Sequence, residues 1–189
     1  MNFSLKPHPL IAQWVPGFTF LTLLWGSLHG WNFSALVPTG AQAVLYTLIL
    51  SVAPFVIGQV FDTIRNTYIE SAFDKCPKRK IWWEEFITAK EDELTRVEEN
   101  YFTYYVLDWN LAFSLIAFRL LSFLLFWLNG APTNMWDGIG LTLAIVFVSR
   151  LFIKDAISLR VELKVIVDRW KIEREGGHRN KEEKNDAPN

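Results

Sequence analysis

Residues 108–128 read DWNLAFSLIAFRLLSFLLFWL, an apolar stretch whose interior contains one charged side chain, Arg119. The stretch matches the roughly 20 apolar residues that a helix needs to cross a bilayer. At about 1.5 Å of rise per residue, Arg119 lies about 16 Å from Asp108, which places it near the centre of the membrane. A cation at that depth is costly and is by default a functional-site hypothesis.

Charge is distributed unevenly along the 189 residues. Residues 7–61 contain no Asp, Glu, Lys or Arg, whereas the chain after Asp62 is densely charged. A soluble core does not separate charge in this way, but alternating contact with membrane and water does. One cysteine, Cys76, excludes an internal disulfide framework, and three scattered histidines fit no metal site. We therefore expect no metal and no cofactor.

Four apolar stretches of spanning length are predicted to form transmembrane helices. They pair into two hairpins, residues 1–61 and 106–153, with spans at 10–30, 40–61, 108–128 and 135–153. The loop within each pair lacks Lys and Arg, whereas the N-terminus, the middle section and the tail contain the basic residues outside the spans. The positive-inside rule therefore places both termini in the cytoplasm, and we expect an all-α polytopic membrane protein.

Two further segments are predicted to be helical and cytosolic. Residues 62–105 have apolar side chains at helical spacing on both sides of a break at Pro77, so we expect an antiparallel helical hairpin. Residues 154–175 are predicted to form an amphipathic helix that continues the last span, although within residues 157–167 an alternation of period two also fits a strand. Residues 176–189 have the composition of a disordered tail.

Arg119 has three candidate roles, which are bracing a neighbouring span, lining a pore, and snorkelling toward the lipid headgroups. Pro54, in the second span, lacks a backbone donor and leaves the carbonyl of Leu50 free. Counting residues from the cytosolic edge puts Leu50 and Ser51 level with Arg119, so we expect Arg119 to donate to the Leu50 carbonyl or to the Ser51 hydroxyl. Alternatively, Arg119 faces the lumen of a homo-oligomeric pore, as basic side chains do in anion-selective channels.

A second polar site is predicted at the cytosolic edge of the spans. Asp62 and Arg65 lie three residues apart on a helix, level with Asp108. They form either an interfacial ion pair of small energetic consequence or a cluster that couples the cytosolic hairpin to the spans.

Two sets of apolar side chains are candidates for contact with a partner. Trp82 and Trp83 follow a basic run at residues 78–80, which suits a membrane-interface anchor or a docking patch for a protein. A heptad-like stripe in the tail consists of Leu159, Leu163, Ile166 and Trp170. The acidic run at residues 91–99 argues against direct binding of nucleic acid by the same hairpin.

The sequence contains no Gly-rich phosphate loop, HExxH motif or serine elbow, so an enzyme is not expected. The best-supported function is a non-enzymatic integral membrane protein whose cytosolic hairpin and tail bind a soluble partner. The layout resembles the small four-span membrane subunits of two-component bacterial antiphage systems of the Kiwa type, in size, in cytosolic termini, and in a charged cytosolic hairpin and tail. This resemblance rests on layout rather than on a motif. It implies a homo-oligomeric sensor or effector subunit of a bacterial inner membrane, active in antiviral defence, that signals to a soluble cytosolic protein.

Overall fold

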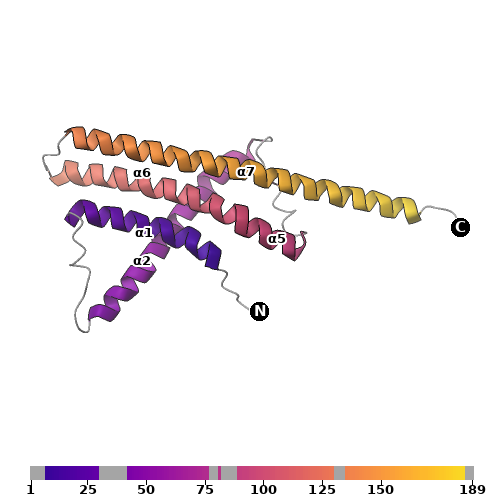
Figure 1. The fold of residues 1–189 in the computed structure, drawn as a ribbon, viewed down its shortest axis with the longest axis horizontal. Helices are drawn as coiled ribbons and strands as arrows, with labels where there is room; N and C mark the ends of the chain where they lie inside the picture. Colours follow the sequence, from indigo (N-terminus) through magenta and orange to yellow (C-terminus); the bar gives the residue numbers. More distant parts are fainter. Residues whose placement is uncertain (1–6, 30–41, 77–80, 82–88, 130–134, 186–189) are drawn as a thin grey trace.

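The computed structural model describes residues 7–29, 42–76, 81, 89–129 and 135–185, which form long helices and contain no strand (Figure 1). In chain order the elements are α1 (Pro7–His29), α2 (Gln42–Ile64), η2 (Arg65–Glu70), α3 (Ser71–Asp74), α5 (Glu91–Val97), η3 (Glu98–Phe102), α6 (Thr103–Asn129) and α7 (Met135–Asn185). The segments η2 and η3 are π-helical, so α2 continues through η2 into α3, and α5 continues through η3 into α6. The prediction of an all-α fold is confirmed for these residues.

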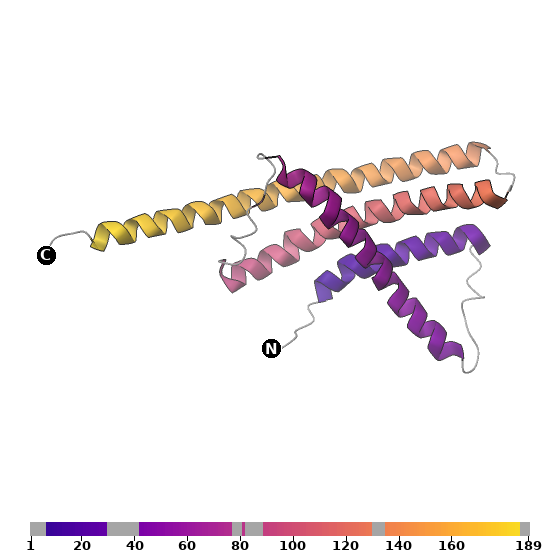
Figure 2. The same ribbon diagram turned by 180° about the vertical axis from the view of Figure 1, so that it is seen from behind.

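Three of the long helices lie side by side, and the fourth crosses them. In Figure 1, α1, α6 and α7 run alongside one another, and α2 lies obliquely across them, as the view from behind also shows (Figure 2). Two helical stretches, Thr47–Asp74 and Glu91–Leu128, are long and apolar enough to cross a membrane. They correspond to α2 with its extension and to α5–η3–α6.

Helix α7 is continuous across residues 157–167, the segment whose sequence fits either a helix or a strand. Residues 141–175 contain neither Gly nor Pro, so no residue type that interrupts a helix occurs there. Residues 157–167 are helical, and their period-two alternation does not produce a strand. The helix also reaches Asn185, whereas the composition after residue 175 predicts disorder. Extending an existing helix avoids the cost of nucleation, and the Lys, Glu and Arg of this segment are good helix formers. Residues 186–189 lie outside the described part of the chain.

The hydrophobic core lies where α3, the start of α6 and the middle of α7 meet. Its buried members are Ala12, Phe73, Ile81, Val97, Tyr105, Val106, Trp109, Ala156, Leu163 and Val167. The rings of Phe73 and Trp109 meet edge to face, with centroids 6.4 Å apart. Along the rest of α2, α6 and α7, by contrast, many large apolar side chains are exposed.

Helices α1 and α2 approach each other closely at two glycines. A Cβ atom at Gly17 would lie 1.8 Å from the carbonyl oxygen of Pro54, and one at Gly58 would lie 1.8 Å from that of Gln13. Because these positions are four residues apart on each helix, the two glycines form one continuous notch on the contact face. Any side chain there would force the backbones apart, since small residues are what allow membrane helices to pack closely.

The variant Gly17→Ala should therefore separate α1 from α2. We expect it to lower the free energy of unfolding by about 1–3 kcal/mol, because the added methyl group meets backbone that cannot rotate away. Gly140→Ala is the matched control, since a Cβ at Gly140 has no atom within 4 Å. Unfolding midpoints of the detergent-solubilised proteins measure the difference, and equal stability of the two variants would contradict the close crossing.

Candidate functional site

A cluster of charged side chains beside the core joins three helical bodies, which are α2–η2–α3, α5–η3–α6 and α7. We call it the Glu70 cluster; its members are Asp62, Arg65, Glu70 and Asp74 of α2–η2–α3, Tyr105 of α6 and Arg160 of α7. Arg65 is 3% exposed and Arg160 is 2% exposed. Removing a guanidinium from water costs several kcal/mol unless the group is paired and hydrogen-bonded. The pairing inside the cluster therefore determines whether the three bodies can pack together.

Glu70 is the central acceptor of the cluster. Its Oε1 accepts a hydrogen bond from Nη1 of Arg65 at 2.7 Å and another from the hydroxyl of Tyr105 at 2.7 Å. Its Oε2 accepts from Nη1 of Arg160, and the same nitrogen donates to the Tyr105 oxygen at 3.0 Å. One carboxylate thus connects side chains from η2, α6 and α7.

Two further carboxylates complete the charge pairing. Asp62 Oδ1 accepts from Nε of Arg65 at 3.2 Å and from Nη2 at 2.9 Å. Asp74 Oδ1 lies 3.8 Å from Nη2 of Arg160 and makes a weaker ion pair. Three carboxylates therefore surround two guanidinium groups, and both arginines have acidic partners on more than one side.

Aromatic rings cover the faces that the carboxylates leave. The Arg160 guanidinium lies 4.3 Å from the centroid of the Phe73 ring, and that of Arg65 lies 5.5 Å from the Tyr105 ring. Burial, and next the neighbouring Glu70 carboxylate, raise the pKa of the Tyr105 hydroxyl. Tyr105 therefore stays protonated at neutral pH and acts as a donor to Glu70.

The π-helical segment η2 is what brings Arg65 and Glu70 together. They are five residues apart, and in an α-helix a residue at that spacing lies about 140° around the axis. A π-turn closes hydrogen bonds between residues five apart, so it returns such a pair to the same face. In η3, on the neighbouring body, the Thr103 hydroxyl donates to the carbonyl of Glu98, also five residues earlier, at 2.8 Å. A search at α-helical spacing finds Asp62 with Arg65 but misses Arg65 with Glu70.

Of the polar residues predicted at the cytosolic edge, the structure brings Asp62 and Arg65 together and places Asp108 elsewhere. The salt bridge between Asp62 and Arg65 measures 2.9 Å. Asp108 is buried on the face of α6 toward α7, where its carboxyl group contacts that of Asp155. The expected trio is thus split, because Asp108 faces α7 and not η2.

The predicted partner of Arg119 is wrong. Its Nε donates to the hydroxyl of Thr142 at 2.8 Å, and its Nη2 donates to the carbonyl of Gly138 at 3.0 Å, both in α7. Leu50 is 38% exposed, and the Ser51 hydroxyl donates to the carbonyl of Thr47. The physical reason is the oblique course of α2, which carries its first half away from α6, whereas α7 runs alongside α6 (Figure 1).

Pro54 and Pro16 are each supported by a neighbouring helix. Pro54 packs against Gly17 of α1. Pro16 leaves the carbonyl of Ala12 without its helical donor, and Nδ2 of Asn110 in α6 donates to that oxygen at 3.3 Å. Asn110 is fully buried. The expected device, a polar side chain that supplies the donor a proline lacks, therefore occurs at Pro16 rather than at Pro54. The sequence feature that could have indicated this contact is Asn110, an amide side chain inside the apolar stretch that begins at Asp108.

The tail stripe predicted to bind a partner packs inside the chain. Leu163 is 0% exposed, and the other three residues of the stripe, Leu159, Ile166 and Trp170, pack against the same core. The stripe faces inward because α7 lies along the start of α6, so the core takes the apolar side of the helix. The exposed apolar side chains of this part of α7 are instead Val161, Val165 and Ile172. Trp82 and Trp83 lie outside the described residues.

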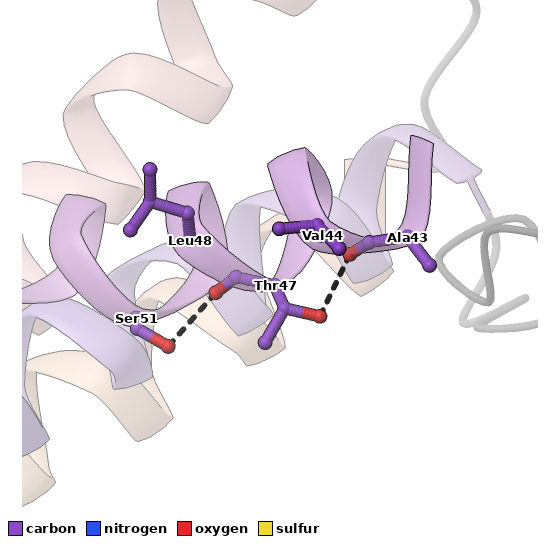
Figure 3. A pocket seen from close by; sticks show the side chains of 5 residues that line it. All are labelled: Ala43, Val44, Thr47, Leu48 and Ser51. Carbon is purple, nitrogen blue, oxygen red and sulfur yellow. Dashed lines mark hydrogen bonds between the residues drawn. The ribbon is translucent and has the colours of Figure 1, made fainter. Parts of the chain in front are cut away.

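An open hollow of about 460 Å³ lies on the exposed half of α2 (Figure 3). It is lined by Ala43, Val44, Thr47, Leu48 and Ser51. The hydroxyls of Thr47 and Ser51 donate to carbonyls four residues earlier, each at 2.8 Å. Among these five residues the hydroxyls are thus satisfied within the helix, and the hollow presents an apolar surface.

Replacing Glu70 tests the central role of its carboxylate. Glu70→Gln keeps the shape of the side chain but leaves two buried guanidinium groups short of a counter-charge, so we expect a loss of about 3 kcal/mol or more in stability. Glu162→Gln removes the same charge from an exposed position on α7 and should change stability by less than about 0.5 kcal/mol. Equal denaturation midpoints for the two variants would show that the Glu70 carboxylate is not the central acceptor of the cluster.

A double-mutant cycle tests the link between Pro16 and Asn110. Asn110→Ala should cost about 1–3 kcal/mol, because the buried Ala12 carbonyl loses its donor. In a Pro16→Ala background a backbone N–H can again reach Ala12, so the same substitution should cost much less. Stability curves of the four proteins measure the coupling, and an unchanged cost in both backgrounds rules it out.

Comparisons with protein-family models, with curated proteins and with solved structures give no match to this chain.

Proposed function

We propose that this chain is an integral membrane protein with four spanning helices and both termini in the cytoplasm, and that its cytosolic end relays a signal from the membrane to a soluble protein. The supporting observation is the opposite placement of apolar and charged side chains. Large apolar side chains are exposed along α1, α2, the second half of α6 and the first part of α7, whereas the charged side chains of Arg65 and Arg160 are buried where η2, α6 and α7 meet.

The exposed apolar surface fits a hydrocarbon environment. Val44 is 78% exposed and Trp127 is 74% exposed. In water a contiguous apolar surface of this extent marks an interaction site or an aggregation hazard, whereas lipid tails solvate it. Exposed Tyr68 and Tyr104 lie beyond one end of this surface, and Trp127 lies at the other end. Amphipathic aromatic rings are enriched at both membrane–water interfaces.

The relay rests on the Glu70 cluster. Because Glu70 holds residues of η2, α6 and α7, a displacement of one span moves the others at their cytosolic ends. Helix α7 continues beyond the rest of the molecule (Figure 1) and exposes Val161, Val165 and Ile172 to a soluble partner. In this proposal the protein is a non-enzymatic, homo-oligomeric sensor or effector subunit of the kind used in bacterial antiviral defence.

The bonding of Arg119 gives less support to a pore. A cation that selects anions from a lumen needs donors free to replace the hydration shell of the ion. Two of the donor nitrogens of Arg119 are instead bound to Thr142 and Gly138. We therefore assign Arg119 to the attachment of α6 to α7.

Cysteine labelling in oriented membrane vesicles tests the topology. The native Cys76 and the variants Ser34→Cys and Ser158→Cys, the latter two in a Cys76→Ser background, report three positions to an impermeant maleimide. Four spans place residues 76 and 158 on one side and residue 34 on the other. If only α2 and α6 cross the membrane, residue 158 is labelled together with residue 34, and the four-span proposal fails. A protein that alkaline carbonate extracts from membranes would refute the membrane assignment itself.

A further inference from the structure

Two basic side chains interrupt the exposed apolar surface of α7. Phe147 and Leu151 are exposed and apolar, and Arg150 and Lys154 are exposed on the same stretch. Residues four apart on a helix lie one above the other, so the two cations form a single basic patch. Their long aliphatic stems can lie on the apolar surface while the charged ends reach a more polar layer.

Two contacts between α6 and α7 fix the level of this patch. Arg119 bonds to Thr142, and Tyr105 bonds to Arg160, in two antiparallel helices. Interpolating between these pairs places Arg150 and Lys154 beside the turn of α6 that begins at Trp109. This is the level at which the apolar stretch of α6 begins, so the patch lies at the boundary between hydrocarbon and headgroups.

Unlike the other cations near it, the basic patch has no counter-ion among the described residues. Arg65 and Arg160 are buried against carboxylates, and Lys164 is paired with Asp168 at 2.8 Å. Among the described residues no ion pair is recorded for Arg150 or Lys154. The adjacent carboxyl group, that of Asp155, contacts Asp108 of α6. The charge of the patch is therefore available to an external anion at this level.

We propose that Arg150 and Lys154 bind the phosphates of anionic phospholipids in the leaflet that surrounds the cytosolic end of α7, an inference that rests on the proposed membrane insertion. The fit is one of charge and depth: two exposed cations at the headgroup level, bordered by the apolar side chains of Phe147 and Leu151 that contact acyl chains. A basic side chain near an anionic surface contributes about a fivefold preference, so the pair gives a preference of roughly 25-fold where the two contributions add.

Energy transfer from the native tryptophans measures lipid enrichment directly. The full chain is reconstituted into phosphatidylcholine vesicles that contain a trace of phosphatidylglycerol or phosphatidylcholine labelled on its acyl chain with dansyl. We expect more transfer to the anionic probe than to the neutral one, and a loss of this difference in the double variant Arg150→Gln/Lys154→Gln. High salt should reduce the preference of the native protein, because exposed charges are screened.

The control variant Lys90→Gln/Arg169→Gln removes two exposed positive charges away from the patch and should keep the preference. If the native protein shows equal transfer to both probes, or if the control loses the preference as fully as the patch variant, the lipid inference is overturned. Flotation of the same vesicles separates this outcome from failure of the proposed function. Protein that floats without lipid preference refutes the patch alone, whereas protein that does not float refutes membrane insertion.

Discussion

Two buried guanidinium groups share one carboxylate, that of Glu70, and the arrangement of α2, α6 and α7 depends on this pairing. A buried ion pair adds little net stability relative to apolar residues, but an unpaired buried charge is severely destabilising. The cluster therefore acts mainly by destabilising other arrangements of the helices, in which a buried charge would lose its partner. Sliding α7 by one helical turn, about 5.4 Å, would take Arg160 away from Glu70 and leave the buried guanidinium of Arg160 without this carboxylate. The relative register of the three bodies is fixed for that reason.

In the proposed membrane protein, the part of the molecule that faces lipid has to be held by other means. Between lipid-solvated helices there is little hydrophobic driving force, so close backbone packing and interhelical hydrogen bonds take its place. The notch formed by Gly17 and Gly58 allows the close backbone packing. The interhelical hydrogen bonds are those from Asn110 to the Ala12 carbonyl and from Arg119 to the Thr142 hydroxyl. Each polar contact involves a group that hydrocarbon could not satisfy, which explains why these few polar residues occur inside apolar stretches.

Local sequence patterns predicted the helices well because helix formation is a local property. The long apolar runs and the absence of Gly and Pro from residues 141–175 were enough for an all-α fold and for a helical segment 157–167. The partner of Arg119 was missed because counting residues along spans assumes that the helices are parallel, and α2 crosses obliquely. Glu70 was missed because a π-turn alters which residues share a face. The stripe containing Leu163 was recognised as an apolar face, but periodicity alone does not say whether such a face packs against the same chain or another one.

The contacts of α2 divide it into three mechanically different parts. In its first half, Val44 and residues 47–52 are exposed. Its middle is clamped to α1 at Pro54 and Gly58, where backbone meets backbone. Its far end, through η2, carries Arg65 and Glu70 into the charged cluster. A long helix held at its middle and loaded at one end behaves as a lever, because bending a continuous hydrogen-bonded helix is harder than tilting it. If α2 lies in a membrane, as proposed, lateral force from lipid on the free half is transmitted to Glu70, where the buried charges tolerate little movement before the pairing is lost. This coupling of an exposed apolar arm to an electrostatically fixed end is the physical argument for the proposed sensor.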